Sequence, residues 1–170
     1  KTLLFLYCLV RSEKPKVVLE TGVANGASTF TILSALERNR HGQLFSIDRS
    51  RDVGQIFGKI HRRWELRVTH GRARDLKRVL SSIPTPDIFL HDADHSYQSQ
   101  IAEYKLATST MATGGWLLSD DVDASNAFGD FCHSRNLSMA LLGDGSKVFG
   151  VTRVGHPRRG GGLDDAREHS

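Results

Sequence analysis

Acidic side chains follow two short apolar runs in the second half of the chain. The run Asp87–Asp92 ends in one carboxylate, and the run Trp116–Ser119 is followed at once by Asp120 and Asp121. If the runs are neighbouring parallel strands, about 4.8 Å apart, Asp92, Asp120 and Asp121 converge at one edge of the sheet. Uncompensated charge of one sign favours protonation, whereas a divalent cation relieves it. Oxygen ligands favour a hard ion, so this pattern predicts a magnesium site.

His95 lies three residues after Asp92, where the next helix is expected to begin. Because histidine titrates near neutrality, it can take the proton of a hydroxyl that a metal has acidified. Asp94 could do the same, or could orient His95. The alternative is helix capping, by Asp94 or Ser96 for the helix after the first run and by Asp123 or Ser125 for the helix after the second. Capping accounts for some of these acids but not for four at two adjacent strand ends, so a metal site is favoured.

A glycine loop follows the first predicted strand, Lys16–Glu20. Gly22 and Gly26 allow a tight turn and a close approach of the backbone to a ligand. Ser28 and the neighbouring N–H groups can hold an anion where the next helix starts. Ala24 stands where a dinucleotide motif has its second glycine, which argues against a pyrophosphate. A ligand that carries a carboxylate instead would fit.

Asp48 ends the second predicted strand, Gln43–Asp48. An acid at this position can accept hydrogen bonds from both hydroxyls of a ribose. The glycine loop and Asp48 together predict a nucleoside-type ligand. The alternative is a plain structural turn with a surface aspartate.

Strand-like and helix-like segments alternate along the chain, which predicts a mostly parallel sheet covered by helices on both faces. A closing hairpin with a Gly-Asp-Gly-Ser turn supplies one reversed strand. The predicted strands are Lys16–Glu20, Gln43–Asp48, Leu66–His70, Asp87–Asp92, Trp116–Ser119, Ser138–Leu142 and Lys147–Thr152. The predicted helices are Leu3–Val10, Ser28–Arg38, Val53–His61, Ala73–Ser82, Tyr97–Thr108 and Ala124–Arg135. Residues 1–154 are expected to form one domain and residues 155–170 a tail.

Composition limits the partners. The chain has 170 residues, 39% of them hydrophobic, and its net charge of +4 comes from 23 basic and 19 acidic residues. The basic residues lack interleaved aromatic side chains, so we expect a solvated face and no nucleic acid. Leu3–Val10 is too short to span a bilayer, so no membrane is expected. Cys8 and Cys132 give no disulfide framework, which favours the cytoplasm.

The quoted motifs resemble those of class I S-adenosylmethionine (SAM)-dependent methyltransferases. Within that class the chain is most similar to cation-dependent O-methyltransferases of the catechol, macrolide-sugar and aminocoumarin-sugar type. Leu19 to Gly22 with Gly26 to Thr29 is similar to the first SAM motif, and Asp48 stands where the ribose acid belongs. The resemblance implies a Rossmann-like methyltransferase fold with a seven-stranded sheet and a C-terminal antiparallel hairpin.

The resemblance also implies a role for each candidate residue. It places Glu20, Gly22 and Gly26 on the methionine side of SAM, Ser28 on its carboxylate, Asp48 on the ribose, Gly71 and Arg72 beside the adenine, Asp92 on both cofactor and metal, Asp120 and Asp121 on Mg²⁺, and His95 or Asp94 as the base. Family members carry an N-terminal extension that shapes the acceptor pocket. Here the first predicted strand already begins at Lys16, so the acceptor stays unassigned.

The predicted function is therefore methyl transfer from SAM to a hydroxyl of a small molecule, such as a sugar or a catechol, assisted by Mg²⁺ and a histidine base. A metal-independent methyltransferase and a non-catalytic SAM-binding protein are the alternatives. A nicotinamide oxidoreductase is disfavoured by the glycine spacing. The predicted partner is a small-molecule acceptor, and a second copy of the chain stays open.

Overall fold

A computed structural model describes residues 1–56, 62–143, 145 and 147–155. Its helices are α1 (Thr2–Glu13), α2 (Ala27–Asn39), α3 (Ala73–Leu80), α4 (Tyr97–Thr108) and α5 (Ala127–Ser134), with a short 3₁₀ turn at Val122–Ala124. The strands are β1 (Val17–Thr21), β2 (Gln43–Asp48), β3 (Trp64–Val68), β4 (Ile88–His91), β5 (Trp116–Ser119), β6 (Met139–Gly143) and β7 (Val148–Arg153).

The seven strands form one sheet in the order β3-β2-β1-β4-β5-β7-β6. β1 to β5 run parallel, and β7 is antiparallel to both β5 and β6. The predicted sheet and its closing hairpin are thus confirmed. β4 and β5 are neighbours, with His91 opposite Ser119, so the residues that follow them come out side by side.

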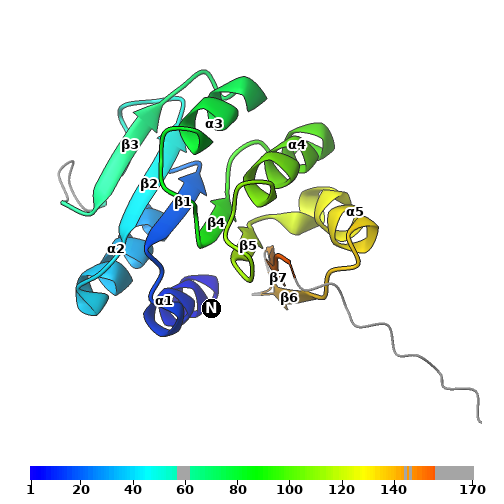
Figure 1. The fold of residues 1–170 in the computed structure, drawn as a ribbon, viewed down its shortest axis with the longest axis horizontal. Helices are drawn as coiled ribbons and strands as arrows, with labels where there is room; N and C mark the ends of the chain where they lie inside the picture. Colours follow the sequence, from blue (N-terminus) through cyan, green and yellow to red (C-terminus); the bar gives the residue numbers. More distant parts are fainter. Residues whose placement is uncertain (57–61, 144, 146, 156–170) are drawn as a thin grey trace, which may run out of the picture.

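Alternating side chains of the strands build a hydrophobic core on each face of the sheet. In β1, Leu19 faces the core beneath α3, α4 and α5, whereas Val18 faces the core beneath α1 and α2. In β4, Phe89 likewise faces the first of these cores and Ile88 the second. Figure 1 shows the two helix layers on opposite sides of the sheet. The strands β1, β2, β4 and β5 are buried from both sides, which explains their nearly continuous apolar sequences, whereas β3 and β6 at the two edges of the sheet are more exposed.

The predicted N-terminal helix packs on the domain as expected, since α1 buries Leu6, Leu9 and Val10 beside α2. Within the described part of the chain, no helix is long and apolar enough to cross a membrane.

Three details differ from the sequence-based expectations. β3 begins at Trp64 and ends at Val68, two residues before the predicted strand ends. Residues 53–56 are not helical, and the rest of the predicted helix Val53–His61 lies outside the described residues. The hydrophobicity of Phe30 predicts a place in the core, but its side chain is 48% exposed on α2, on the side of that helix that faces away from the sheet.

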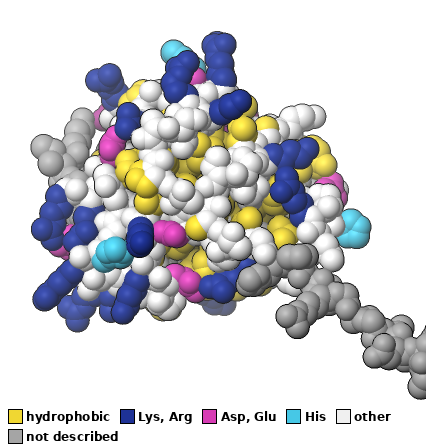
Figure 2. All heavy atoms as spheres, in the orientation of Figure 1, with side chains coloured by type: hydrophobic (Ala, Val, Ile, Leu, Met, Phe, Trp, Pro, Cys, Tyr) yellow, Lys and Arg dark blue, Asp and Glu magenta, His cyan; other side chains and the backbone are white. Residues whose placement is uncertain are grey.

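Basic residues of the predicted solvated face are exposed, among them Arg62, Arg72, Arg74, Lys77 and Arg78. Figure 2 shows Lys and Arg side chains at several places around the visible face, with Asp and Glu between them. This distribution fits a solvated face better than one continuous basic surface.

Candidate functional site

A cavity of about 410 Å³ opens at the carboxyl ends of β1, β2 and β4. This is the edge at which open α/β sheets bind their ligands, and the volume is ordinary for a small-molecule site. Six of the residues predicted to bind the cofactor or to act as the base line it: Gly22, Asp48, Gly71, Arg72, Asp92 and Asp94.

Gly22 lets the loop after β1 pass directly against the loop after β4. Its φ is +85°, and a Cβ built on it would lie 1.8 Å from the carbonyl oxygen of Asp92. A backbone hydrogen bond from the Asp92 N–H to Thr21 holds this crossing, and one from the Gly22 N–H to Ile47 ties the loop to β2 on its other side. Only glycine fits this floor of the cavity without displacing the backbone.

Asp48 holds the glycine loop as well as lining the cavity. Its carboxylate accepts hydrogen bonds from the N–H groups of Val23 (2.8 Å), Ala24 (3.4 Å) and Ser50 (2.9 Å). Burial alone would raise the pKa of Asp48, but these hydrogen bonds outweigh it and keep the pKa below its usual value. Asp48 is therefore ionised at neutral pH, which suits an acceptor of hydroxyl protons.

Glu20 lies beneath the cavity and is fully buried. Its carboxylate accepts hydrogen bonds from the hydroxyls of Ser28 (2.6 Å), Thr29 (2.7 Å) and Ser46 (2.7 Å), and burial nevertheless raises its pKa. It thereby ties β1 to β2 and to the start of α2. Glu20, Gly26 and Ser28 are outside the set of described residues that lines the cavity. The predicted contact of the Ser28 hydroxyl with a ligand carboxylate stays a prediction, since that hydroxyl donates to Glu20 here.

The predicted metal ligands follow the neighbouring strands β4 and β5. The charge of Asp120 acts on Asp92, and both Asp120 and Asp121 accept a hydrogen bond from the Lys147 ammonium, each at 3.0 Å. These two contacts raise the pKa of Lys147 above its usual value, so the ammonium stays charged. Within the described ranges, no three His, Cys, Asp or Glu side chains are grouped as metal ligands. The donor set as arranged fits an ammonium group, and the magnesium site stays a prediction.

Asp92 carries the largest electrostatic perturbation of the cluster. Burial raises its pKa to about 8, and the charge of Asp120 and then that of Glu20 add to the effect, although Lys147 opposes it. Asp92 is therefore mostly protonated at neutral pH in this arrangement. Such perturbed carboxyl groups in a cavity are typical of functional sites.

The two candidate bases lie in different surroundings. His95 is partly buried, with Nε2 3.5 Å from a carboxylate oxygen of Asp121. Asp94 is exposed and accepts a hydrogen bond from the N–H of Ser96, the residue just before α4, but no side chain caps the helix N–H groups themselves. Since the Asp94 carboxylate is already engaged in this turn, His95 is the better placed of the two candidates.

The sequence analysis missed Glu103, which lines the cavity from α4. One carboxylate oxygen of Glu103 accepts a hydrogen bond from the Thr21 hydroxyl (2.8 Å) and lies 2.9 Å from His91 Nδ1. His91 lies inside the predicted strand Asp87–Asp92, which favours a structural role; it is completely buried and connects the end of β4 to this carboxylate. An inward-facing acid on a helix that follows a predicted site was the available signal.

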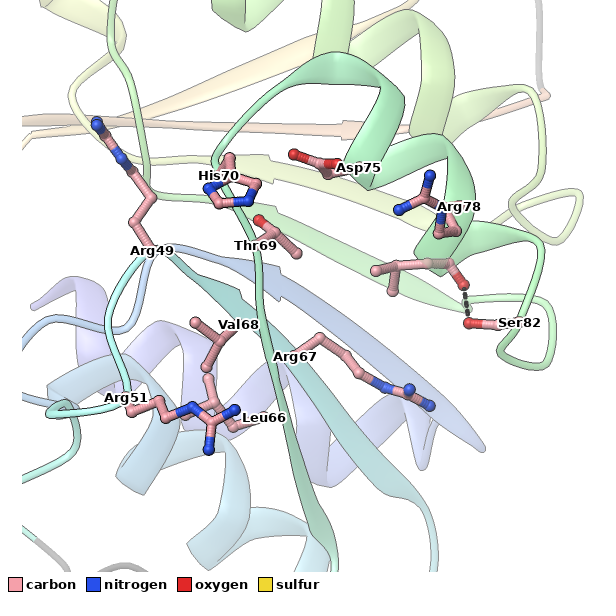
Figure 3. A pocket seen from close by; sticks show the side chains of 11 residues that line it. Arg49, Arg51, Leu66, Arg67, Val68, Thr69, His70, Asp75, Arg78 and Ser82 are labelled. Carbon is pink, nitrogen blue, oxygen red and sulfur yellow. Dashed lines mark hydrogen bonds between the residues drawn. The ribbon is translucent and has the colours of Figure 1, made fainter.

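A second hollow, of about 850 Å³, lies beside the edge strand β3 and adjoins the cavity at Arg49 and Thr69. Figure 3 shows Arg49, Arg51, Arg67 and Arg78 on different sides of it, with their guanidinium groups well apart. Because these groups do not meet at one point, the hollow is a solvated basic groove and not a single anion site.

Comparisons with known proteins agree with this geometry. Residues 19–122 match the sequence profile of the methyltransferase domain family, and no curated protein matches the chain. An O-methyltransferase from Bacillus cereus, solved with S-adenosylhomocysteine, is similar at 21% identity and a TM-score of 0.70, over 89% of this chain and 80% of that one. TomG from Streptomyces achromogenes, an O-methyltransferase of tomaymycin synthesis solved with SAM, is similar at 18% identity and a TM-score of 0.71, over 91% of this chain and 80% of TomG. The methyltransferase MycE from the mycinamycin pathway, solved with Mg and S-adenosylhomocysteine, is similar at 15% identity and a TM-score of 0.67, over 92% of this chain and 49% of MycE.

The sheet order and the reversed seventh strand are those of a class I methyltransferase with a Rossmann-like fold. The profile match covers more than half of the chain, and it includes the glycine loop, Asp48 and the acidic cluster. The chain belongs to the methyltransferase domain family.

Proposed function

We propose that the protein transfers the methyl group of SAM to a hydroxyl oxygen of a small molecule. The observation that carries the proposal is the cavity in which Gly22, Asp48 and Gly71 lie together at the carboxyl end of the sheet. Proteins of similar fold include O-methyltransferases solved with SAM or with its product S-adenosylhomocysteine, which supports the same cofactor for this protein.

In this proposal the ionised carboxylate of Asp48 accepts hydrogen bonds from the ribose hydroxyls. Gly71 and Arg72 lie beside the adenine, and Gly22 lets the methionine part of SAM approach the backbone. The reacting groups meet near Asp92, where the acceptor hydroxyl loses its proton to His95. The carbon–sulfur bond of SAM breaks as the new carbon–oxygen bond forms. Alignment of the two substrates supplies most of the rate, because the sulfonium is already activated.

A magnesium-assisted reaction is the second candidate, and it is favoured by the approach of Asp92, Asp120 and Asp121 to one another. If bound there, Mg²⁺ would acidify the acceptor hydroxyl. Because Lys147 already pairs with two of these acids, the reaction without a metal is the first candidate.

The test is transfer of label from methyl-labelled SAM to a panel of catechols, sugars, amines and thiols, with and without EDTA. We expect label in an ether of a hydroxyl acceptor and a rate that EDTA does not change. Loss of the rate in EDTA, restored by Mg²⁺, would establish the magnesium-assisted reaction instead. Binding of S-adenosylhomocysteine without transfer to any acceptor would favour a non-catalytic SAM-binding protein.

A further inference from the structure

Lys147 comes from a part of the chain remote from the acids with which it pairs. It precedes β7, which runs antiparallel to β5 with Gly150 opposite Ser119. This register brings the start of β7 over the two acids that follow β5. The Val148 N–H also donates a hydrogen bond to the Asp123 carboxylate (3.1 Å), which fixes the backbone beside Lys147.

The ammonium group bridges the two acids. Nζ lies 3.0 Å from Oδ2 of Asp120 and 3.0 Å from Oδ2 of Asp121. The Asp120 and Asp121 side chains are only 17% and 25% exposed, whereas that of Lys147 is 51% exposed, so water screens these contacts only in part. Two carboxylates therefore hold one tethered cation.

A divalent ion on the same acids would have to displace this ammonium or lie within a few ångströms of it. Like charges at such distances repel strongly in a partly buried site. The lysine is also part of the chain, so it loses no translational freedom when it pairs, whereas a free ion does. Both effects favour the lysine over the ion.

We propose that Lys147 is a built-in cation that occupies the place of a divalent metal on Asp92, Asp120 and Asp121, so that this cluster takes up a divalent ion only when the lysine is removed. The inference deepens the proposed function, on which it rests for the position of the acceptor beside the cluster. It makes Lys147 the residue that sets the reaction apart from its metal-assisted form.

The test is a titration of the protein with Mn²⁺, followed by electron paramagnetic resonance of the free ion. We expect weak binding by the unmodified protein, and binding of one ion about tenfold tighter or more in Lys147→Met. Adding Asp120→Asn to that variant should remove the gain. Lys147→Arg, which keeps the positive charge, should bind as weakly as the unmodified protein. Lys77→Met, on the exposed side of α3, is the matched control and should change nothing.

Equal affinity of the unmodified protein and Lys147→Met for Mn²⁺ would overturn the inference. So would a gain in Lys147→Met that Asp120→Asn leaves intact, because the ion would then bind elsewhere. Near-ultraviolet circular dichroism verifies that each variant is folded. The readout needs neither SAM nor methyl transfer, so failure of the proposed function and failure of this inference are distinguishable.

Discussion

Asp92→Asn is expected to make the protein more stable at alkaline pH. The raised pKa of about 8 means that the folded protein retains a proton on Asp92 that the unfolded chain gives up near pH 4. The free energy of unfolding therefore falls as the pH rises from about 4 to about 8, and above that range Asp92 is a charged group next to Asp120. An amide has no charge to bury and mimics the protonated acid.

We expect the variant to gain about 3 kcal/mol over the unmodified protein at pH 9, roughly half of what the full shift would give, and much less at pH 5. Urea unfolding at both pH values, in EDTA, measures the difference. Asp52→Asn, at an exposed position, is the control and should show no such dependence. A stability difference between Asp92→Asn and the unmodified protein that does not grow with pH would contradict the electrostatic account of the cluster.

Gly22→Ala is expected to remove cofactor binding and to lower the free energy of unfolding by about 4 kcal/mol. An alanine at a φ of +85° costs about 1–2 kcal/mol, and overpacking adds about 1–3 kcal/mol. The added methyl group would meet the carbonyl oxygen of Asp92, so the loops after β1 and β4 must separate. That separation would distort the floor of the cavity.

Gly114→Ala is a matched control, because Gly114 has a similar φ of +79° but nothing within 4 Å of the added Cβ. Gly114→Ala should lower the free energy of unfolding only by the cost of an alanine at positive φ, about 1 kcal/mol. Urea unfolding gives both values. If the two variants lose the same stability, the backbones do not cross at Gly22 as described.

The central strands of the sheet were predicted well because they are buried on both faces. Trp116–Ser119 and Gln43–Asp48 were predicted to the residue, as apolar runs bounded by glycine or by acids. The end of β3 was less clear, since this edge strand has Arg67 and Val68 partly open to solvent. Phe30 was misplaced because hydrophobicity alone does not tell which side of a helix faces the sheet.

The candidate site was predictable where it depends on strand ends. Gly22, Asp48 and Asp92 each follow or end a strand, and strand order alone brings them to one cavity. The three hydroxyl groups that donate hydrogen bonds to Glu20 were not predictable, because the sequence alone does not show that this carboxylate is buried and therefore needs donors.

Lys147 could not be predicted from local pattern, since it lies 26 residues from Asp121 and reaches it only through the pairing of β7 with β5. A cluster of acids in sequence therefore predicted a metal, while the folded chain supplies a cation of its own. The same pairing that closes the sheet thus changes the chemistry expected at its edge.

The most direct test of the central claim is calorimetric titration of S-adenosylhomocysteine into the folded protein in EDTA. The account predicts binding of one molecule, lost in Gly22→Ala and retained in Gly114→Ala. No binding to the folded, unmodified protein would contradict the assignment of this cavity to SAM, and with it the proposed methyl transfer.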